Sequence, residues 1–288
     1  MCNSCGRTFG WRRPSVKHAR ESVWFRRWIV EGYAFRQLAF QSGHSISTIR
    51  RIVRYWLLRP PDDMGELSGY RYLIFDGTNL EGRRGLFAAM DGERNYLLHG
   101  ACDVSEGPRD LLPFCRALKE RGLVPRSATV NGNPHLIRIL RMVWLEIIIQ
   151  RCLVHIQRQG LSWCRLKPKR TDAKHLRKLF LQVGRISTFD HRDRFLEGVA
   201  EWESRYGIRI AASPETGWVF SDLKRARSML LVALPNMFHY LEDPKIPHTT
   251  NSLEGYFSRL KQKYRQHRGL VKSHRSAYFK WYFHLCRR

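Results

Sequence analysis

The stretch YRYLIFDGTNLEGRRGLFAAMDGERNYLLHGACDV, residues 70–104, decides the fold of this chain. It contains three runs rich in aromatic and aliphatic residues, at residues 70–75, 85–90 and 95–104, which are typical of β-strands. Asp91 and Gly92 separate the second run from the third, and this dipeptide favours a tight hairpin. The stretch therefore predicts three antiparallel strands, the first of which ends at Asp76.

Helices and strands alternate in the residues that follow. The spacing of apolar residues predicts a helix over residues 110–121, ended by Gly122, and a second helix over residues 136–143. Short apolar runs predict strands at residues 127–130 and 145–150. This order favours an α/β fold with a mixed sheet of the RNase H type over residues 70–151.

The rest of the chain reads as helical. Residues 152–245, with amphipathic segments at 173–183 and 191–206, predict a helical insertion after the last strand. Residues 246–288 then supply a helix that closes the core, beginning near Asn251, and a basic tail. Four apolar residues of this helix share one face: Leu253, Tyr256, Phe257 and Leu260.

A small helical domain precedes the sheet, at residues 15–59. Helical spacing runs over residues 22–58 with a break at residues 42–45, where Ser45 is placed to cap the second helix. The outward face of that helix presents Ser47, Arg50, Arg51 and Arg54. The pattern predicts a helix-turn-helix that reads a DNA groove, and the alternative is a helical hairpin with a solvated basic face. Residues 60–69, rich in proline and glycine, form a linker.

Residues 1–14 resemble half of a zinc knuckle, with Cys2, Cys5 and Gly6. A structural zinc ion needs four ligands, and the chain has no second Cys-x-x-Cys pair. The partner pair was lost upstream of Met1, or the knuckle is vestigial. Zinc binding is therefore doubtful. The odd, scattered set of seven cysteines argues against a disulfide framework and favours a reducing cytoplasm.

The charge of the chain points to its partner. Lys and Arg total 51 against 25 Asp and Glu, which gives a formal net charge of +26. Nucleic acid is the partner that such a charge favours, ahead of a ribosomal or membrane-surface role, and no apolar run approaches the roughly 20 residues of a membrane helix. Besides the helix-turn-helix, the candidate DNA contacts are Lys167, Lys169, Arg170, Arg259, Lys261, Lys263 and Arg265.

Two carboxylates stand where a magnesium site would form. Asp76 follows the first strand and Glu254 lies in the first turn of the closing helix. Carboxylates are the ligands that Mg²⁺ prefers, and metal-dependent phosphodiester cleavage needs such ligands from converging elements. Asn131 follows the fourth strand, where a further carboxylate would be expected.

Several motifs carry a family resemblance. They are FDGT at residues 75–78, the Gly132-Asn133-Pro134 step, QRCLVHIQR at residues 150–158 and HTTNSLEGYFSRLKQKYRQHRGL at residues 248–270. In this order they make the chain similar, along most of its length, to Mutator-type insertion-sequence transposases of the DDE superfamily. The resemblance implies an RNase H-like core that cuts and joins double-stranded DNA with Mg²⁺, or Mn²⁺, as a homodimer or larger assembly. A bacterial cytoplasmic protein, associated with the nucleoid when bound to DNA, is then expected.

The same resemblance implies which residues do the chemistry. Asp76, the residue at position 131 and Glu254 would be the catalytic, metal-binding triad, while Cys152, His155 and Asn251 belong to family motifs of uncertain role. Asn131 replaces the family's Asp, through natural decay or deliberate change, and an amide keeps one coordinating oxygen but loses the charge. We expect weakened cleavage with DNA binding retained. A non-catalytic, transposase-derived DNA-binding protein is the alternative, and a structure-specific nuclease or junction resolvase ranks behind it.

Overall fold

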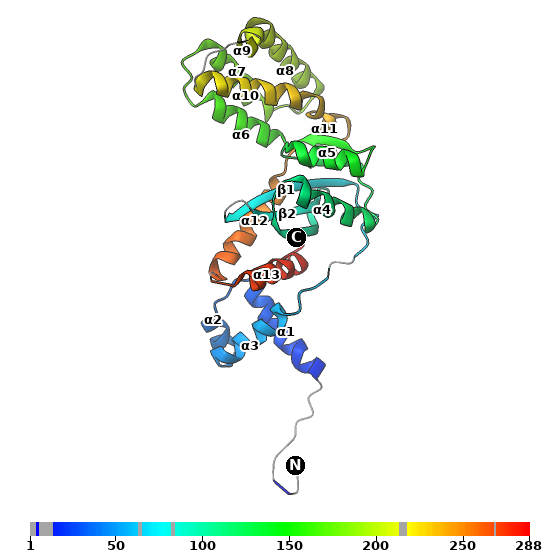
Figure 1. Cartoon of the computed structure of the whole chain (residues 1–288), viewed down its shortest axis with the longest axis vertical. Helices are drawn as coiled ribbons and strands as arrows, with labels where there is room; N and C mark the ends of the chain where they lie inside the picture. Colours follow the sequence, from blue (N-terminus) through cyan, green and yellow to red (C-terminus); the bar gives the residue numbers. More distant parts are fainter. Residues whose placement is uncertain (1–3, 6–13, 63–64, 82–83, 213–217, 268) are drawn as a thin grey trace. The chain divides into compact units, whose positions relative to one another are not determined.

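The computed structural model describes residues 1–288 except 1–3, 6–13, 63–64, 82–83, 213–217 and 268 (Figure 1). Contacts divide the chain into two compact units. One contains residues 1–63 and 257–287, and the other contains residues 64–256 with Arg288. Of the predicted knuckle, Cys2 lies outside the described residues and Cys5 is an exposed free cysteine.

A mixed α/β sheet is the framework of the larger unit. Its five strands are β1 (Tyr72–Glu81), β2 (Arg84–Asp91), β3 (Tyr96–Val104), β4 (Ser127–Val130) and β5 (Ile148–Arg151), in the spatial order β3-β2-β1-β4-β5. β1, β2 and β3 pair antiparallel, while β1–β4 and β4–β5 pair parallel. The hairpin at Asp91 and Gly92 is confirmed.

The prediction that the first strand ends at Asp76 is wrong. β1 continues to Glu81 because its second half pairs with β2, so the polar residues of that half stay in register. The parallel pairing with β4, however, stops at Phe75 opposite Val130. Asp76 and Asn131 are therefore the first residues beyond that pairing, on adjacent strands.

Two helices cover one face of the sheet. α4 (Pro108–Glu120) and α5 (Pro134–Val143) share a buried cluster with Leu73 and Phe75 of β1. Because successive side chains of a strand point to opposite faces, Asp76 faces away from this cluster. Gly122, at φ +80°, follows α4 as predicted.

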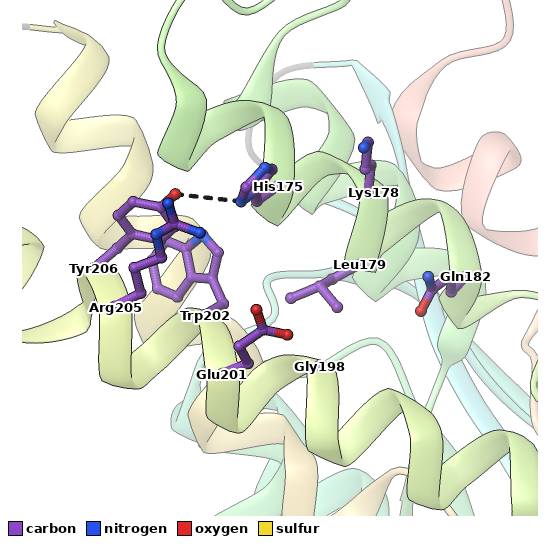
Figure 2. Close-up of a pocket in the computed structure, with 9 residues that line it drawn as sticks. All are labelled: His175, Lys178, Leu179, Gln182, Gly198, Glu201, Trp202, Arg205 and Tyr206. Atoms are coloured by element: carbon purple, nitrogen blue, oxygen red, sulfur yellow. Dashed lines mark hydrogen bonds between the residues drawn. The ribbon is translucent and has the colours of Figure 1, made fainter.

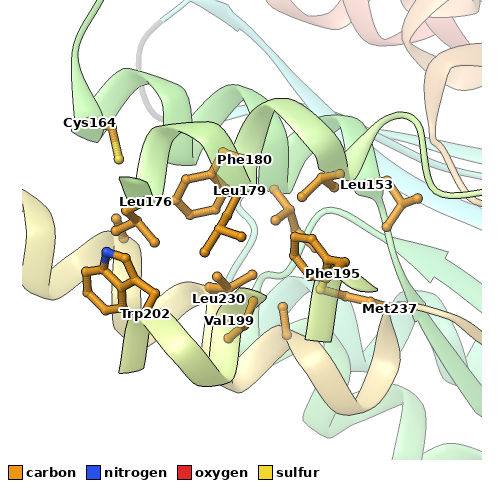
Figure 3. Close-up of a cluster of buried hydrophobic side chains, with 14 of the residues drawn as sticks. Leu153, Cys164, Leu176, Leu179, Phe180, Phe195, Val199, Trp202, Leu230 and Met237 are labelled. Carbon is orange, nitrogen blue, oxygen red and sulfur yellow. The ribbon is translucent and has the colours of Figure 1, made fainter. Parts of the chain in front are cut away.

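The insertion forms a helical body with its own core (Figure 3). Phe180, Phe195 and Trp202 are among its buried side chains. The second predicted segment is shorter than expected, because α8 ends at Trp202 and a π-turn over Glu203–Gly207 follows. Its elements are α6 (Leu153–Cys164), α7 (Thr171–Val183), α8 (Phe189–Trp202), α9 (Ile208–Ala212), α10 (Trp218–Ala233), a 3-10 turn (Leu234–Asn236) and α11 (His239–Glu242).

The smaller unit contains three helices from the start of the chain: α1 (Pro14–Val30), α2 (Phe35–Ser42) and α3 (Ile46–Leu57). The sequence predicted one break in this helical stretch, at residues 42–45. The structure has a second break after α1, at Gly32, whose φ is +74°. The end of the chain is not a tail. α13 (Lys272–Leu285) packs on α1 and α3 through aromatic rings, including a bond from the Trp281 indole to the carbonyl of Trp56.

α12 (Asn251–Tyr264) begins in the larger unit, and its residues from Phe257 onward belong to the smaller one. A 3-10 turn (Arg265–His267) follows it. The predicted apolar face is confirmed, because Leu253, Tyr256, Phe257 and Leu260 are all buried. Within the described ranges, no helix is long and apolar enough to cross a membrane.

Removal of the α3 cap is expected to destabilise the smaller unit. Ser45 Oγ accepts a hydrogen bond from the Thr48 amide at 3.2 Å, as predicted. Ser45→Ala should therefore lower the free energy of unfolding by about 1 kcal/mol in urea denaturation followed by circular dichroism. Ser45→Asn, which retains a cap, and Ser22→Ala, within α1, serve as controls. Equal stability of Ser45→Ala and the parent protein would contradict the prediction.

Candidate active site

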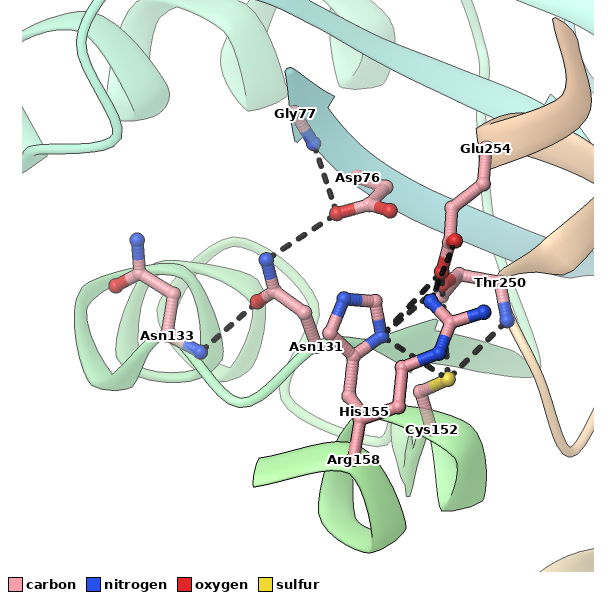
Figure 4. Close-up of polar contacts among 9 residues, drawn as sticks. All are labelled: Asp76, Gly77, Asn131, Asn133, Cys152, His155, Arg158, Thr250 and Glu254. Atoms are coloured by element: carbon pink, nitrogen blue, oxygen red, sulfur yellow. Dashed lines mark hydrogen bonds and ion pairs between the residues drawn. The ribbon is translucent and has the colours of Figure 1, made fainter. Parts of the chain in front are cut away.

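Side chains from three elements meet where the parallel pairing of the sheet ends (Figure 4). Asp76 comes from β1, His155 from α6 and Glu254 from the first turn of α12. One potential ligand atom of each of these residues lies within 4.8 Å of those of the other two. The structure thus brings together the two predicted carboxylates, which lie 178 residues apart in sequence (254 minus 76), and adds an imidazole.

Asp76 is almost completely buried, at 3% exposure. Burial disfavours its charged form and raises the pKa of the carboxyl group from 3.8 to about 6, with the nearby His155 and the Gly77 amide acting in the opposite direction. Gly77 N donates to Asp76 Oδ1 at 2.9 Å. A carboxylate held in this way carries charge that a bound cation would stabilise.

Asn131 presents the wrong end of its amide for a metal ligand. Its Oδ1 accepts the backbone N–H of Asn133 at 3.0 Å, and its Nδ2 donates to Asp76 Oδ1 at 3.2 Å. A backbone N–H can only donate, so the Asn133 amide fixes which end of the Asn131 side chain faces Asp76. The predicted oxygen ligand at this position is therefore turned away from Asp76.

Glu254 is held by a cation that the sequence analysis had not singled out. Arg158 Nη1 donates to Glu254 Oε2 at 2.9 Å. This bond raises the pKa of Arg158, whose side chain is largely exposed. Arg158 lies three residues after His155, so both occupy one face of α6, and this helical spacing could have identified it.

Cys152 and His155 form a polar pair behind the carboxylates. His155 Nδ1 lies 3.2 Å from Cys152 Sγ and 3.3 Å from Thr250 Oγ1, and the Thr250 amide donates to Cys152 Sγ at 3.3 Å. Although burial opposes it, these hydrogen bonds lower the pKa of the Cys152 thiol, and the bond to Cys152 raises the pKa of His155. These contacts hold the His155 ring next to the carboxylates of Asp76 and Glu254.

A third acid lies close by. Glu106 directly precedes Gly107, the N-cap residue of α4. Asn133 Nδ2 instead donates to the Glu106 carbonyl at 2.8 Å and to its carboxylate at 3.3 Å. The charge of Glu106 contributes to the raised pKa of Asp76.

Most of the predicted DNA-binding residues are exposed. Ser47, Arg50, Arg51 and Arg54 are exposed on α3, and Lys167, Lys169, Arg259 and Arg265 are also exposed. Lys261 is partly buried, and Asn251 is exposed at the start of α12.

Two of the predicted DNA contacts, Arg170 and Lys263, also have partners within the chain. Arg170 forms a two-pronged ion pair with Asp172, which is buried at 5% exposure rather than lying on the surface. Lys263 donates to the Glu31 carbonyl at 3.1 Å. Both cations therefore stabilise the fold, a role that composition could not reveal.

The helical body has a hollow of its own, about 240 Å³ in volume, between α7 and α8 (Figure 2). Its lining mixes the acid Glu201 with the cations Lys178 and Arg205, and Tyr206 Oη lies 3.3 Å from His175 Nδ1. A second hollow, of about 440 Å³, has Trp163 and Leu223 in its lining beside Lys167 and Lys169.

The raised pKa of the buried Asp76 should make the stability of the protein depend on pH. Its pKa is higher in the fold than its ordinary 3.8, so its stabilising contribution is full below pH 4 and is lost as the pH rises through 6. Asp76→Asn should therefore melt like the parent protein near pH 4. By pH 8, without divalent cations, it should be more stable by about 2–3 kcal/mol.

Calorimetry between pH 4 and 8 measures this difference, and Asp110→Asn is the control. Hydrogen bonds from Ser105 lower the pKa of Asp110 to about 2, so its contribution is full above pH 4. Its replacement should destabilise the protein by an amount that does not change across this range. A stability difference for Asp76→Asn that stays flat with pH would contradict a raised pKa.

The comparisons with known proteins add no family assignment: no family model matches the chain, and no curated protein matches it.

Proposed function

We propose that the protein is a transposase-type DNA-binding enzyme with an RNase H-like core, whose magnesium-dependent cleavage of DNA is weakened by Asn131. The observation that carries the proposal is the meeting of Asp76 and Glu254 at one edge of a mixed sheet, in a chain with a net charge of +26. Three antiparallel strands followed by two parallel ones support the RNase H-like assignment.

The donor set fits a hard divalent cation. Asp76 and Glu254 supply carboxylate oxygens, and His155 supplies a nitrogen that Mn²⁺ accepts more readily than Mg²⁺. When bound, such cations stabilise the attacking and leaving oxygens of a phosphodiester. Arg158 would hold Glu254 in place, and the Cys152–Thr250 contacts would orient His155.

The exposed cations of α3 support double-stranded DNA as the partner. Ser45 caps this helix, and the Gly43 turn at φ +68° joins it to α2, as a helix-turn-helix requires. Joining two ends of a mobile element needs two active sites, so a homodimer or larger assembly on DNA belongs to the proposal.

A non-catalytic DNA-binding protein is the second candidate. The orientation of Asn131, whose Nδ2 faces Asp76, favours it, because an N–H group is not a metal ligand. Both candidates predict DNA binding. They differ in whether an Asp at position 131 would allow the protein to cleave DNA.

The test is DNA cleavage in Mg²⁺ by this protein and by Asn131→Asp, side by side, on DNA carrying the ends of the encoding element. Cleavage in Asn131→Asp that disappears when Asp76→Ala is added supports the transposase. Retained DNA binding without cleavage in either protein supports the non-catalytic binder. Cleavage that survives Asp76→Ala overturns the proposed site.

A further inference from the structure

The larger hollow of the helical body, about 440 Å³ in volume, lies where α6 ends and the chain turns into α7. Its size is within the range of pockets that bind small ligands, roughly 300–1,000 Å³. The apolar part of its lining comes from Trp163, Cys164, Pro168, Ala173 and Leu223. The cations of the lining are Arg165, Lys167, Lys169 and Arg170. Among the described residues, the lining contains no acid.

Trp163 lines this hollow without a ring partner of its own. It is partly buried against the core of the helical body. Trp202, in the same body, donates its indole N–H to the Asp172 carbonyl at 2.9 Å and lies beside the Tyr206 ring. Trp163 has no hydrogen-bond or ring partner within the part of the chain that the structure describes. Its flat ring therefore offers a surface on which another flat ring can stack.

The two arginines of the lining already have partners, and the two lysines do not. Arg165 lies 3.6 Å from Asp222, and Arg170 pairs with a buried acid of α7. Lys167 and Lys169 are exposed, and neither has an ion-pair partner among the described residues. Two free cations beside an apolar hollow favour a ligand that combines negative charge with a flat apolar group.

We infer that this hollow binds an unstacked base of a single DNA strand, with the base on Trp163 and neighbouring phosphates on Lys167 and Lys169. Bases of every type stack on aromatic side chains, and lysines contact phosphates without reading sequence. Duplex DNA presents the same phosphates but keeps its bases paired and stacked, so an intact duplex does not fill the hollow. The inference rests on the proposed function for DNA as the partner, but base binding itself is measured without cleavage.

Labelled oligothymidylate of about 12 nucleotides is the probe, and an abasic strand of the same length carries the phosphates without the bases. Fluorescence anisotropy without divalent cations should show that the parent protein binds the base-bearing strand about tenfold more tightly. Trp163→Leu should lose this preference and retain its affinity for the abasic strand. Trp163→Phe, which keeps a flat ring, should retain most of the preference.

Phe189→Leu is the matched control, because it removes an exposed aromatic ring from α8 of the same helical body. It should keep the preference for bases. Equal preferences in Trp163→Leu and Phe189→Leu would overturn the inference, as would a parent protein that binds both strands alike. Trp163→Met repeats the test if the leucine variant does not fold.

The lysines should act on both strands. Lys167→Gln combined with Lys169→Gln should lower the affinity for the base-bearing and the abasic strand alike. The slope of log affinity against log salt should become shallower by about 1–2. Arg185→Gln combined with Arg194→Gln removes two exposed charges elsewhere on the helical body and should change this slope less. Equal slopes in the two double variants would contradict the lysines as phosphate contacts.

An acidic peptide is the other occupant that these side chains could accept. If polyglutamate of equal charge competed with the labelled strand as well as unlabelled oligothymidylate does, the hollow would be a peptide site and the inference would fall.

The base preference and the proposed cleavage fail independently. A preference that needs Trp163, in a protein whose Asn131→Asp variant never cleaves DNA, keeps the base site and rejects the transposase. Cleavage by Asn131→Asp without any base preference rejects the base site and leaves the proposed function intact.

Discussion

Magnesium-dependent DNA cleavage by Asn131→Asp is expected to exceed that of the protein with Asn131 by on the order of a hundredfold. The present amide directs Nδ2, a donor, at Asp76. A carboxylate in its place offers oxygens at the same point, beside Asp76 and Glu254, and restores one negative charge to the metal-binding set. Gel separation of cut and uncut DNA measures the rate.

The same substitution should weaken the metal-free fold. It removes the Asn131–Asp76 hydrogen bond and places two carboxylates together, so we expect a loss of about 1–3 kcal/mol at pH 8. Mn²⁺ or Mg²⁺ should restore most of that stability. Asn95→Asp, on an exposed turn, makes the same chemical change and should show neither effect. If Mn²⁺ and Mg²⁺ left the stability of Asn131→Asp unchanged, that result would contradict a cation site at this position.

Local sequence patterns predicted most strands of the sheet and identified both Asp76 and Glu254 as candidate metal ligands. The apolar runs of the strands, the Asp91-Gly92 turn and the Ser45 cap depend on a few neighbouring residues, so their signals are present in the sequence itself. The end of β1 could not be predicted from its own residues, because the pairing of its second half with β2 decides where the strand ends.

The features missed are those that depend on distant partners. The orientation of Asn131 follows from the Asn133 backbone, and the burial of Arg151 follows from its register opposite Val130. The C-terminal segment reads as a basic tail, yet its rings pack on helices more than two hundred residues earlier, as the Trp281–Trp56 bond shows. Composition identifies such charges and rings but not what they contact.

Loss of the α3 cations should have the largest effect on DNA binding. Arg50, Arg51 and Arg54 are exposed on one helix, and the Arg50 guanidinium lies 5.9 Å from the ring centre of Phe35 on α2. If each contacts a phosphate, replacing all three with Ala should lower affinity for duplex DNA about a hundredfold at physiological salt. The slope of log affinity against log salt should become shallower by about 2–3.

A variant of equal charge separates a binding surface from the general effect of net charge. Replacing Arg109, Arg116 and Arg138, exposed on α4 and α5, removes the same three charges. Fluorescence anisotropy with labelled duplexes, from 50 to 300 mM salt, compares the two proteins. Because phosphate contacts act only at short range, the α3 variant should lose at least tenfold more affinity than this control. Equal losses would mean that α3 is a solvated basic hairpin, and DNA binding would then have to be assigned to another surface of the chain.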